Sequence, residues 1–424
     1  MPDTDVQPTA ALPYLTAGLP GTGGAIKQYN EDFVVEELPL YPAGGEGTHV
    51  YALVEKRGLT TLAAIEQVAR QLERQRRDIG YAGLKDAHGV TRQWISIEHV
   101  DPEAVRAIAT DRLRVIEVAR HTNKIKLGHL SGNRFEIAIR EAGADSLSRA
   151  RAILDQLAAR GAPNYYGPQR FGARGDNAVI GAAVLRGEYD TAVALMLGRP
   201  GPVDHGQVRR AREFYDAGDL EQSAALWRRG FPQQFRLCRA MIESKGNARK
   251  AWRAVDLTLQ KLMASAFQSD LFNRVVARRI GGLNKLLDGD LAWKHSNGAC
   301  FRVENAETEQ PRCDRFEISP SGPLFGPRMT EATGRPGGME DDVLAASGFT
   351  KEQITSREMG KMTGARRPLR VPLGSPSVES GEDERGPFLK LRFSLPAGSY
   401  ATTVTREVCK AEGAERSEDS ASES

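Results

Sequence analysis

Alternating apolar and polar residues predict β-strands near both ends of the chain. In residues 134–141, Phe135, Ile137 and Ile139 alternate with polar or small residues, and residues 388–395 repeat this period of two. Successive side chains of a strand point to opposite faces, so this period is typical of a strand with one buried face. Further strand-like segments, rich in β-branched and aromatic residues, lie at residues 33–40, 48–56, 93–100 and 112–120.

Apolar residues repeat at helical spacing in two longer segments. Residues 61–77 place apolar side chains on one face, and residues 256–280 carry one at every fourth position before a Gly-Gly pair. This spacing predicts amphipathic helices, and glycine commonly follows a helix end. The apolar face of the second helix consists of Leu259, Met263, Phe267, Leu271 and Val275. Asp-Pro-Glu at residues 101–103 favours a further helix start, because Asp caps free amides and Pro tolerates the first turn.

The order of these elements predicts an α+β protein in which one domain is inserted into another. Strand-rich segments lie before about residue 160 and again from residue 388, with a helix expected near Ser399, whereas residues 165–365 are mainly helical. One α+β domain built from both ends of the chain, with a helical domain between them, explains this order. Two Gly-rich or polar segments, residues 331–342 and 375–386, are predicted to be loops.

The composition indicates a globular chain of two or three domains. Of its 424 residues, 40% are hydrophobic and 27% are charged, and no apolar run reaches the roughly 18 residues of a membrane span. The first residues lack the basic and apolar regions of a secretory signal. The four cysteines are far apart and form no CxxC pair, which favours free thiols and a cytoplasmic location.

Charge and motif content narrow the class of function. The net charge is +3, and because residues 411–424 are acidic, the rest of the chain carries a larger positive surplus that is compatible with a polyanionic partner. The sequence contains no GxxxxGK(S/T) phosphate loop, no HExxH and no HxE with PCxxC. The glycines of GTGGA at residues 21–25 do not follow a strand, and the seven histidines are scattered. We therefore expect neither a nucleotide cofactor nor a metal site.

Three stretches carry candidate chemistry, and each also has a structural explanation. Asp86 lies between two glycines within residues 80–94, where it could form a turn or act chemically. Residues 164–177 interleave Tyr and Phe with Arg and Gln, which suits stacking on unpaired bases but also suits a buried aromatic hinge. Residues 128–139 place Asn133 and an arginine before a phenylalanine at a strand start, which is also typical of a turn followed by a core residue.

Taken together, the three stretches fit an enzyme that acts on a nucleotide extruded from an RNA chain. An aromatic ring would stack on the base while the isolated carboxylate acts on the same nucleotide. Along nearly its full length the chain resembles the TruD family of tRNA pseudouridine synthases, and GLKD and NYYGPQRFG are the most specific of the matching motifs. The six motifs occur in the order IKQYNEDFVVEE (26–37), YAGLKDAHGVTRQW (81–94), GHLSGNRFEI (128–137), NYYGPQRFG (164–172), FQSDLFNRV (267–275) and LPAGSYATTVTRE (395–407).

The resemblance implies an α+β catalytic domain of the pseudouridine synthase type, with a mixed or antiparallel sheet and helices, interrupted by a largely helical inserted TRUD domain. It implies isomerisation of uridine to pseudouridine, in bacterial members at position 13 of tRNA, without a cofactor. The expected partner is tRNA, with no membrane, and the chain is expected to be a monomer. The expected parts are a flexible lead (1–24), a catalytic domain (25–163 and 369–410), an inserted domain (164–368) and an acidic disordered tail (411–424).

The resemblance also implies roles for individual residues. Asp86 occupies the position of the family's catalytic aspartate, which acts on the ribose either as a nucleophile at C1′ or as the base that removes the 2′-proton. Lys27 occupies the family's position for the cation that keeps this acid ionised. Lys85 is adjacent in sequence but should point to the opposite side, as neighbours on an extended strand do. Phe135 is the ring expected to stack on the target base, and Asn133 is a polar group that orients the site.

The NYYGPQRFG segment adds Arg170 and Phe171 as expected substrate-binding residues, which either face the RNA or brace the hinge beside the inserted domain. Other functions stay open. The same chemistry could act on another structured RNA, or the chain could be an RNA-binding or folding protein with incidental activity. An RNA glycosidase that releases the free base is a further alternative. The pairing of Asp86 with Lys27 favours the synthase, because a pure binding protein has no need of it.

Overall fold

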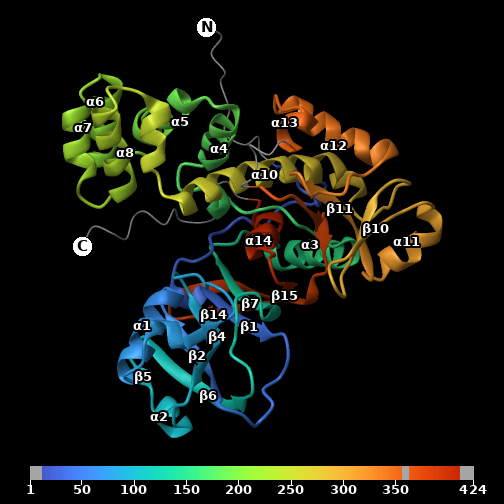
Figure 1. Ribbon diagram of the computed structural model, residues 1–424. Helices are drawn as coiled ribbons and strands as arrows, with labels where there is room; N and C mark the ends of the chain where they lie inside the picture. The colour runs from blue at the N-terminus through green and yellow to red at the C-terminus, as the bar shows by residue number, and fades with distance from the viewer. Residues whose placement is uncertain (1–11, 356–361, 411–424) are drawn as a thin grey trace. The chain divides into compact units, whose positions relative to one another are not determined.

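The computed structural model describes residues 12–355 and 362–410, which fall into two units (Figure 1). Residues 14–162 and 371–410 form one unit, which is called the sheet unit. Residues 12–13, 163–355 and 362–370 form the other, which is called the helical unit. The mixed sheet of the first and the predominance of helices in the second confirm the α+β class predicted from the sequence. The predicted acidic tail at 411–424 lies outside the described residues.

The described residues of the sheet unit form a nine-stranded mixed sheet with the strand order β14-β15-β7-β1-β4-β2-β6-β5, and β3 pairs with β4 beside this path. Only the β1–β4 pair of this sheet is parallel, and the other described pairs are antiparallel. The strands are β1 (Phe33–Pro39), β2 (His49–Arg57), β3 (Ile79–Tyr81), β4 (Val90–Glu98), β5 (Ala109–Thr110), β6 (Leu113–His121), β7 (Leu130–Arg140), β14 (Gly374–Asp383) and β15 (Gly386–Pro396). They include every strand predicted from alternation.

One face of this sheet is apolar because the inward positions of neighbouring strands are in register. Val35 of β1 lies opposite Phe135 of β7, and Phe135 lies opposite Phe393 of β15. All three side chains are buried. The predicted alternation around Phe135 therefore marks β7, which contributes to the apolar face between β15 and β1.

Among the described residues, the α-helices of the sheet unit are α1 (Thr61–Gln71), α2 (Pro102–Arg106), α3 (Ser146–Arg160) and α14 (Ala401–Cys409). Ile65 and Val68 of α1 are buried in a cluster with Val54 of β2 and Ile95 of β4, which fixes the helix on the sheet. The cap predicted for α2 is present, since the side chain of Asp101 accepts a hydrogen bond from the amide of Glu103. α1 ends at Gln71 and is therefore shorter than the helix predicted at residues 61–77. A 3₁₀ turn follows at Arg76–Asp78.

Residues 14–24 are attached to α14, although we expected them to belong to a flexible lead. The carboxylate of Glu407 accepts hydrogen bonds from the amide of Leu15 at 2.7 Å and from the amide and hydroxyl of Thr16 at 3.0 and 2.6 Å. Leu15 and Thr16 are both buried. A buried carboxylate with several donors is a strong local anchor, and sequence pattern alone gave no sign of it.

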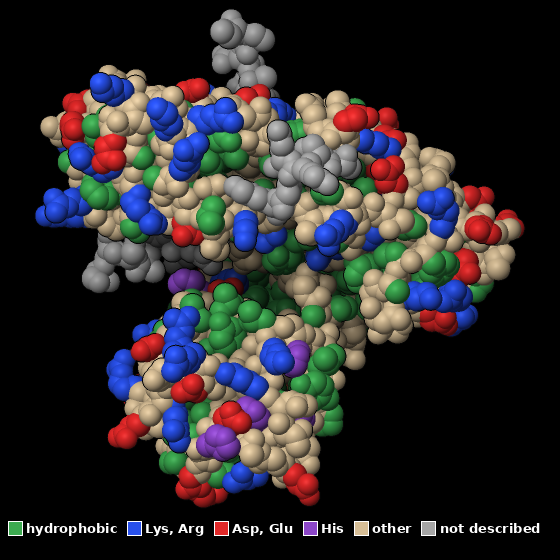
Figure 2. Space-filling model, viewed as in Figure 1, with side chains coloured by type: hydrophobic (Ala, Val, Ile, Leu, Met, Phe, Trp, Pro, Cys, Tyr) green, Lys and Arg blue, Asp and Glu red, His purple; other side chains and the backbone are tan. Residues whose placement is uncertain are grey.

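The opposite face of the sheet carries charges that neutralise one another across the strands. Arg92 of β4 lies between Glu36 of β1 and Glu55 of β2, and Glu55 also pairs with Arg114 of β6. Figure 2 shows that Lys and Arg side chains are interspersed with Asp and Glu on the side of the molecule in view. These arginines are therefore held by carboxylates on neighbouring strands.

Helices dominate the helical unit, which also contains a four-stranded sheet in the order β10-β9-β11-β12. Its helices are α4 (Asn177–Arg186), α5 (Tyr189–Leu197), α6 (Gly206–Asp216), α7 (Leu220–Trp227), α8 (Pro232–Glu243), α9 (Ala248–Ala251), α10 (Leu257–Arg279), α11 (Ala306–Asp314), α12 (Gly334–Ala346) and α13 (Lys351–Thr355). Its strands are β9 (Leu291–Lys294), β10 (Cys300–Arg302), β11 (Ile318–Leu324) and β12 (Ala365–Pro368). The chain passes between the units at β8 (Ala162–Pro163) and β13 (Arg370–Val371).

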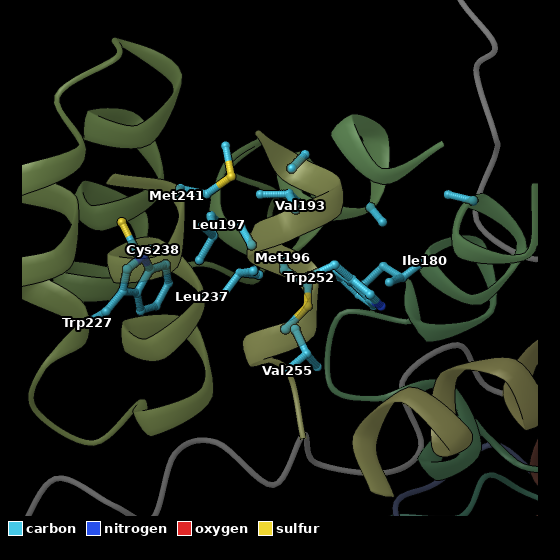
Figure 3. Close-up of a cluster of buried hydrophobic side chains, with 14 of the residues drawn as sticks. Ile180, Val193, Met196, Leu197, Trp227, Leu237, Cys238, Met241, Trp252 and Val255 are labelled. Atoms are coloured by element: carbon cyan, nitrogen blue, oxygen red, sulfur yellow. The ribbon is translucent and has the colours of Figure 1, made fainter. Parts of the chain in front are cut away.

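The core of the helical unit lies among its short helices. Leu197 of α5, Trp227 of α7 and Leu237 of α8 belong to one buried cluster (Figure 3). α10 matches the helix predicted at 256–280, and its residues Phe267 and Leu271 are buried. None of the helices in the described ranges is both long enough and apolar enough to cross a membrane.

The Gly-rich segment predicted to be a loop at residues 331–342 instead contributes most of α12. Gly337 lies so close to the carbonyl of Ala332 that a Cβ atom would come within 2.6 Å of its oxygen. Glu340 of the same helix is buried and pairs with Arg366 at 2.7 Å. The prediction was wrong because glycine here permits close packing, and not only backbone freedom.

The polar segment at residues 375–386 was also wrongly predicted to be a loop. It forms β14 and the turn to β15, with Val378 opposite Leu391 and Ser380 opposite Leu389. β14 is the first strand in the sheet order and pairs with β15 alone among the described strands. An edge strand can be polar because its stability comes from the neighbouring strand, so its composition resembles that of a loop.

Candidate functional site

Asp86 lies in the loop between β3 and β4, and the backbone of this loop helps to fix the position of its side chain. One carboxylate oxygen, Oδ1, accepts a hydrogen bond from the amide of His88 at 3.3 Å, as in an Asx turn. Gly89 ends the loop against β1, where a Cβ atom would lie 2.6 Å from the carbonyl oxygen of Phe33. Asp86 therefore does form a turn, and its second oxygen, Oδ2, is left for another partner.

Lys27 is that partner. Its Nζ lies 2.7 Å from Oδ2 of Asp86, and the two side chains are only 12% and 19% exposed. The same ammonium lies 4.4 Å from the ring centre of Phe33. Lys27 has a φ of +58°, a left-handed conformation that costs a non-glycine residue about 1 to 3 kcal/mol. Such strain is typical of functional positions, and here it accompanies an ammonium held against a carboxylate.

Lys85 contacts a different set of groups. Its Nζ lies 2.8 Å from Oε2 of Glu37 and donates a hydrogen bond to Oδ1 of Asn133 at 2.7 Å. Burial raises the pKa of the Glu37 carboxyl, and the nearby charge of Lys85 opposes this shift. The two adjacent residues Lys85 and Asp86 thus direct their charges to separate partners, and of Lys85 and Lys27 it is Lys27 that contacts the Asp86 carboxylate.

Phe135 lies on the same face of β7 as Asn133, two residues away. Its ring packs 5.4 Å from that of Phe393 and 6.3 Å from that of Phe33, measured between ring centres. It is 6% exposed, so most of its surface is already in contact with protein. The structure therefore brings Lys27, Asn133 and Phe135 into the sheet unit with Asp86, while the stacking role of Phe135 stays a prediction.

Arg170 and Phe171 belong to the helical unit, at a 3₁₀ turn (Pro168–Phe171). Phe171 is buried in a cluster that includes Tyr166 and Ala266. Arg170 donates hydrogen bonds to Ser269 at 3.2 Å and Ser265 at 3.0 Å. Both side chains therefore have packing or bonding partners within their own unit, and their contact with substrate stays a prediction.

Two buried ionisable residues near the loop were missed by the sequence reasoning. Glu37 continues the inward positions Phe33 and Val35 of β1, and Lys56 continues the inward position of Val54 in β2. Glu37 and Lys56 are 2% and 1% exposed. A charged residue at an inward position of an alternating strand is a signal that could have identified both, because such a residue is seldom buried without a partner.

The arrangement is suited to chemistry by a carboxylate. An ionised Asp86 next to a fixed ammonium can attack an electrophilic carbon or accept a proton, and aromatic rings lie on the adjacent strands. Within residues 12–355 and 362–410, no group of three or more His, Cys, Asp or Glu side chains is placed to hold a metal ion.

Comparison with known proteins gives a consistent result. The sequence profile of the family described as tRNA pseudouridine synthase D (TruD) matches residues 10–408. The tRNA pseudouridine synthase D of Geobacter metallireducens is 49% identical over 397 residues, covering 94% of this chain and 97% of the relative. That of Anaeromyxobacter dehalogenans is 38% identical over 405 residues, covering 95% and 97%. A crystal structure of a Methanosarcina mazei protein described as TruD matches with a TM-score of 0.82 at 28% identity, covering 94% of this chain and 96% of that one. The chain therefore belongs to the TruD family of tRNA pseudouridine synthases.

Proposed function

We propose that Asp86 is the catalytic carboxylate of a reaction that converts a uridine of tRNA to pseudouridine. Family membership gives the reaction class: the chain is a tRNA pseudouridine synthase, an isomerase. The observation that carries the assignment to Asp86 is its 2.7 Å contact with Lys27, in which both side chains are largely shielded from water. A fixed positive charge at this distance attracts the negative charge of the carboxylate and orients its second oxygen.

In the proposed reaction the N1–C1′ bond of the uridine breaks and a C5–C1′ bond forms. The hydrogen at C5 leaves as a proton, and N1 of the rotated base gains one, so that the product is an isomer of the substrate. Asp86 acts on the ribose, as a nucleophile at C1′ or as the base that removes the 2′-proton. Phe135 stacks on the base and Asn133 orients it, with no cofactor required. Arg170 and Phe171 contribute to RNA binding from the helical unit.

The finer description of the protein is part of the same proposal. The sheet unit corresponds to a pseudouridine synthase-type catalytic domain, formed by residues 25–163 and 369–410, and residues 164–368 to an inserted TRUD domain. The substrate position is uridine 13 of tRNA. The enzyme acts as a monomer in the cytoplasm, where tRNA is found and where the four free cysteines would stay reduced.

The test is tritium release from a tRNA transcript that carries [5-³H]uridine, because formation of the C5 bond expels the hydrogen at that position. The wild type should release tritium without added metal or cofactor, whereas Asp86→Asn, which keeps the shape of the side chain, should not. Asp111→Asn is a matched control, since Asp111 is an exposed aspartate of the same unit. Both variants should bind tRNA as tightly as the wild type.

The alternatives give different results in this assay. Turnover by Asp86→Asn at the wild-type rate would remove Asp86 from the mechanism. Release of free uracil would indicate a glycosidase, and binding without any release would indicate another RNA substrate or a binding protein. A transcript with cytidine at position 13 should release no tritium, and continued release would reject that position.

A further inference from the structure

The backbone of the loop that carries Asp86 is bonded at three points to buried side chains. Nζ of Lys56 donates to the carbonyl of Asp86 itself at 2.8 Å. The hydroxyl of Thr61 accepts from the amide of Lys85 at 2.8 Å, and Nε2 of Gln93 donates to the carbonyl of Gly83 at 3.2 Å. These three side chains, called the loop anchor, belong to β2, the first turn of α1 and β4. Three separate elements of the sheet unit therefore converge on four consecutive loop residues.

Lys56 is the charged member of the loop anchor. Besides the carbonyl of Asp86, its ammonium donates to the carbonyl of Leu59, and the side chain is 1% exposed. Burial lowers the pKa of Lys56 to about 8, the charge of Asp86 opposes this shift and that of Lys85 adds to it. The neighbouring elements present uncharged side chains to it, since Thr61 of α1 and Gln93 of β4 line the same small cavity. A lysine placed where burial disfavours its charge is held there by the backbone groups it binds.

Thr61 and Gln93 fix the direction of the remaining bonds. The hydroxyl of Thr61 accepts from the amide of Lys85 and donates its single proton to Oε1 of Gln93 at 2.7 Å. The amide nitrogen of Gln93 then donates to Gly83. Thr61 and Gln93 are each 2% exposed, so water does not replace these partners readily. These hydrogen bonds form a chain from the amide of Lys85 through Thr61 and Gln93 to the carbonyl of Gly83, and the donor and the acceptor of each bond are determined.

This arrangement explains how two adjacent loop residues reach different partners. With the amide of Lys85 and the carbonyl of Asp86 both bound, the backbone between them is fixed on both sides. The side chain of Lys85 then extends to Glu37 and that of Asp86 to Lys27. A rotation of this peptide would move the Asp86 carboxylate relative to Lys27, and displacements of about 1 Å can cost a reaction about a hundredfold in rate.

We propose that Lys56, Thr61 and Gln93 are positioning residues that hold the loop so that the Asp86 carboxylate stays aligned for catalysis, and that Lys56 does so in its charged form. The proposal rests on the proposed catalytic role of Asp86. None of the three needs to touch the RNA, so they set the rate of the chemical step and leave tRNA affinity unchanged. Charge-assisted hydrogen bonds are roughly twice as strong as neutral ones, so the charged ammonium holds the loop carbonyls more strongly than the neutral amine would.

The test measures single-turnover tritium release and tRNA binding for Lys56→Met and Thr61→Val. Each should lower the rate at saturating tRNA by about tenfold or more, with a dissociation constant within about twofold of the wild type. Thr61→Ser should restore the rate because it returns the hydroxyl. Thr91→Val is the matched control. Thr91 lies opposite Lys56 and is buried, but its hydroxyl has no hydrogen-bond partner among the described residues, so this variant should keep the wild-type rate.

A pH series adds a readout that loss of packing would not give. As the pH rises from 7 to 9.5, the wild type loses the charge of Lys56 whereas Lys56→Met has none to lose. The ratio of the wild-type rate to the Lys56→Met rate should therefore be largest near pH 7 and decrease above pH 8. If Lys56→Met does not fold, judged by its circular dichroism, the Thr61 pair of variants carries the test by itself.

The outcomes separate the two proposals. Wild-type rates for Thr61→Val and Lys56→Met, or losses confined to tRNA affinity, would overturn the loop anchor while an inactive Asp86→Asn still supported the catalytic assignment. A pH-independent rate ratio would overturn the role of the Lys56 charge. Turnover by Asp86→Asn would overturn the catalytic assignment of Asp86 and also the proposal that the loop anchor aligns Asp86 for catalysis.

Discussion

Lys27→Met removes the ammonium that contacts Asp86 while keeping an unbranched side chain of similar length. The left-handed backbone at this position, with φ of +58°, is equally strained for lysine and methionine. The substitution therefore changes the electrostatic partner of the carboxylate and leaves the backbone cost unaltered. We expect turnover to fall because the Asp86 carboxylate loses the charged hydrogen-bond donor that holds it in place.

The size of the effect follows from the geometry of the pair. The distance between Nζ and Oδ2 is 2.7 Å, and neither side chain is more than 19% exposed. An exposed ion pair is worth about 0.2 to 1 kcal/mol, whereas a hydrogen bond to a charged group away from water is worth about 1.5 to 3 kcal/mol. Since each 1.36 kcal/mol of barrier is tenfold in rate, we expect the rate to fall by about 10- to 150-fold.

The assay is single-turnover tritium release at saturating tRNA, combined with a filter-binding measurement of tRNA affinity. Lys126→Met is the control, because Lys126 is an exposed lysine of the same unit and its loss removes the same charge. Both variants should lose a similar, small amount of affinity, since each removes one positive charge near a polyanion. Only Lys27→Met should lose rate once the tRNA is bound.

A Lys27→Met rate within about threefold of the wild type at saturating tRNA would refute this reasoning if Asp86→Asn were inactive. It would mean that other groups keep the carboxylate aligned. Equal rate losses in Lys27→Met and Lys126→Met would mean that the loss of one positive charge, and not the loss of the contact with Asp86, lowers the rate.

Two further predictions concern the side chains beside the loop. Because burial raises the pKa of Glu37 above its ordinary 4.5, the folded protein keeps a proton that the unfolded chain loses, and stability should fall as pH rises from 4.5 through that raised value. In Glu37→Gln this fall should be absent, so the melting temperature of the wild type minus that of the variant should decrease over this range; a constant difference would contradict the shift. Phe135→Leu and Phe393→Leu both break the ring pair at 5.4 Å, worth about 0.5 to 1.5 kcal/mol, and should lose similar stability in urea unfolding. Only Phe135→Leu should also lose base stacking of about 1 to 3 kcal/mol and hence turnover, and equal activity losses would assign Phe135 to packing alone.

The sequence by itself determines the elements whose signals are local. The alternation at Phe135 and Ile137 predicts β7, and apolar residues in steps of four predict α10, because each pattern reports which side of one element is buried. The Asp101 cap of α2 depends on a hydrogen bond between residues two apart. Six ordered motifs, of which GLKD and NYYGPQRFG are the most specific, indicated the family, which the comparisons confirm.

Other elements were decided by contacts between distant parts of the chain. α12 is a helix although its sequence is Gly-rich, since Gly337 packs on a carbonyl and Glu340 pairs with Arg366 of β12. β14 is a strand although it is polar, because β15 supplies its hydrogen bonds. Local propensity predicts loops in both places, and tertiary packing overrides it.

The same distinction applies to the site. Asp86 could be selected from its motif, but it lies 59 positions after Lys27 in the sequence, and only the fold brings their charges to 2.7 Å. The inward strand positions of Lys56 and Glu37 could have marked both residues as buried, but the sequence does not show which groups they contact. A charge is stable inside a protein only where partners from other elements meet it, and those partners are assembled by the tertiary structure.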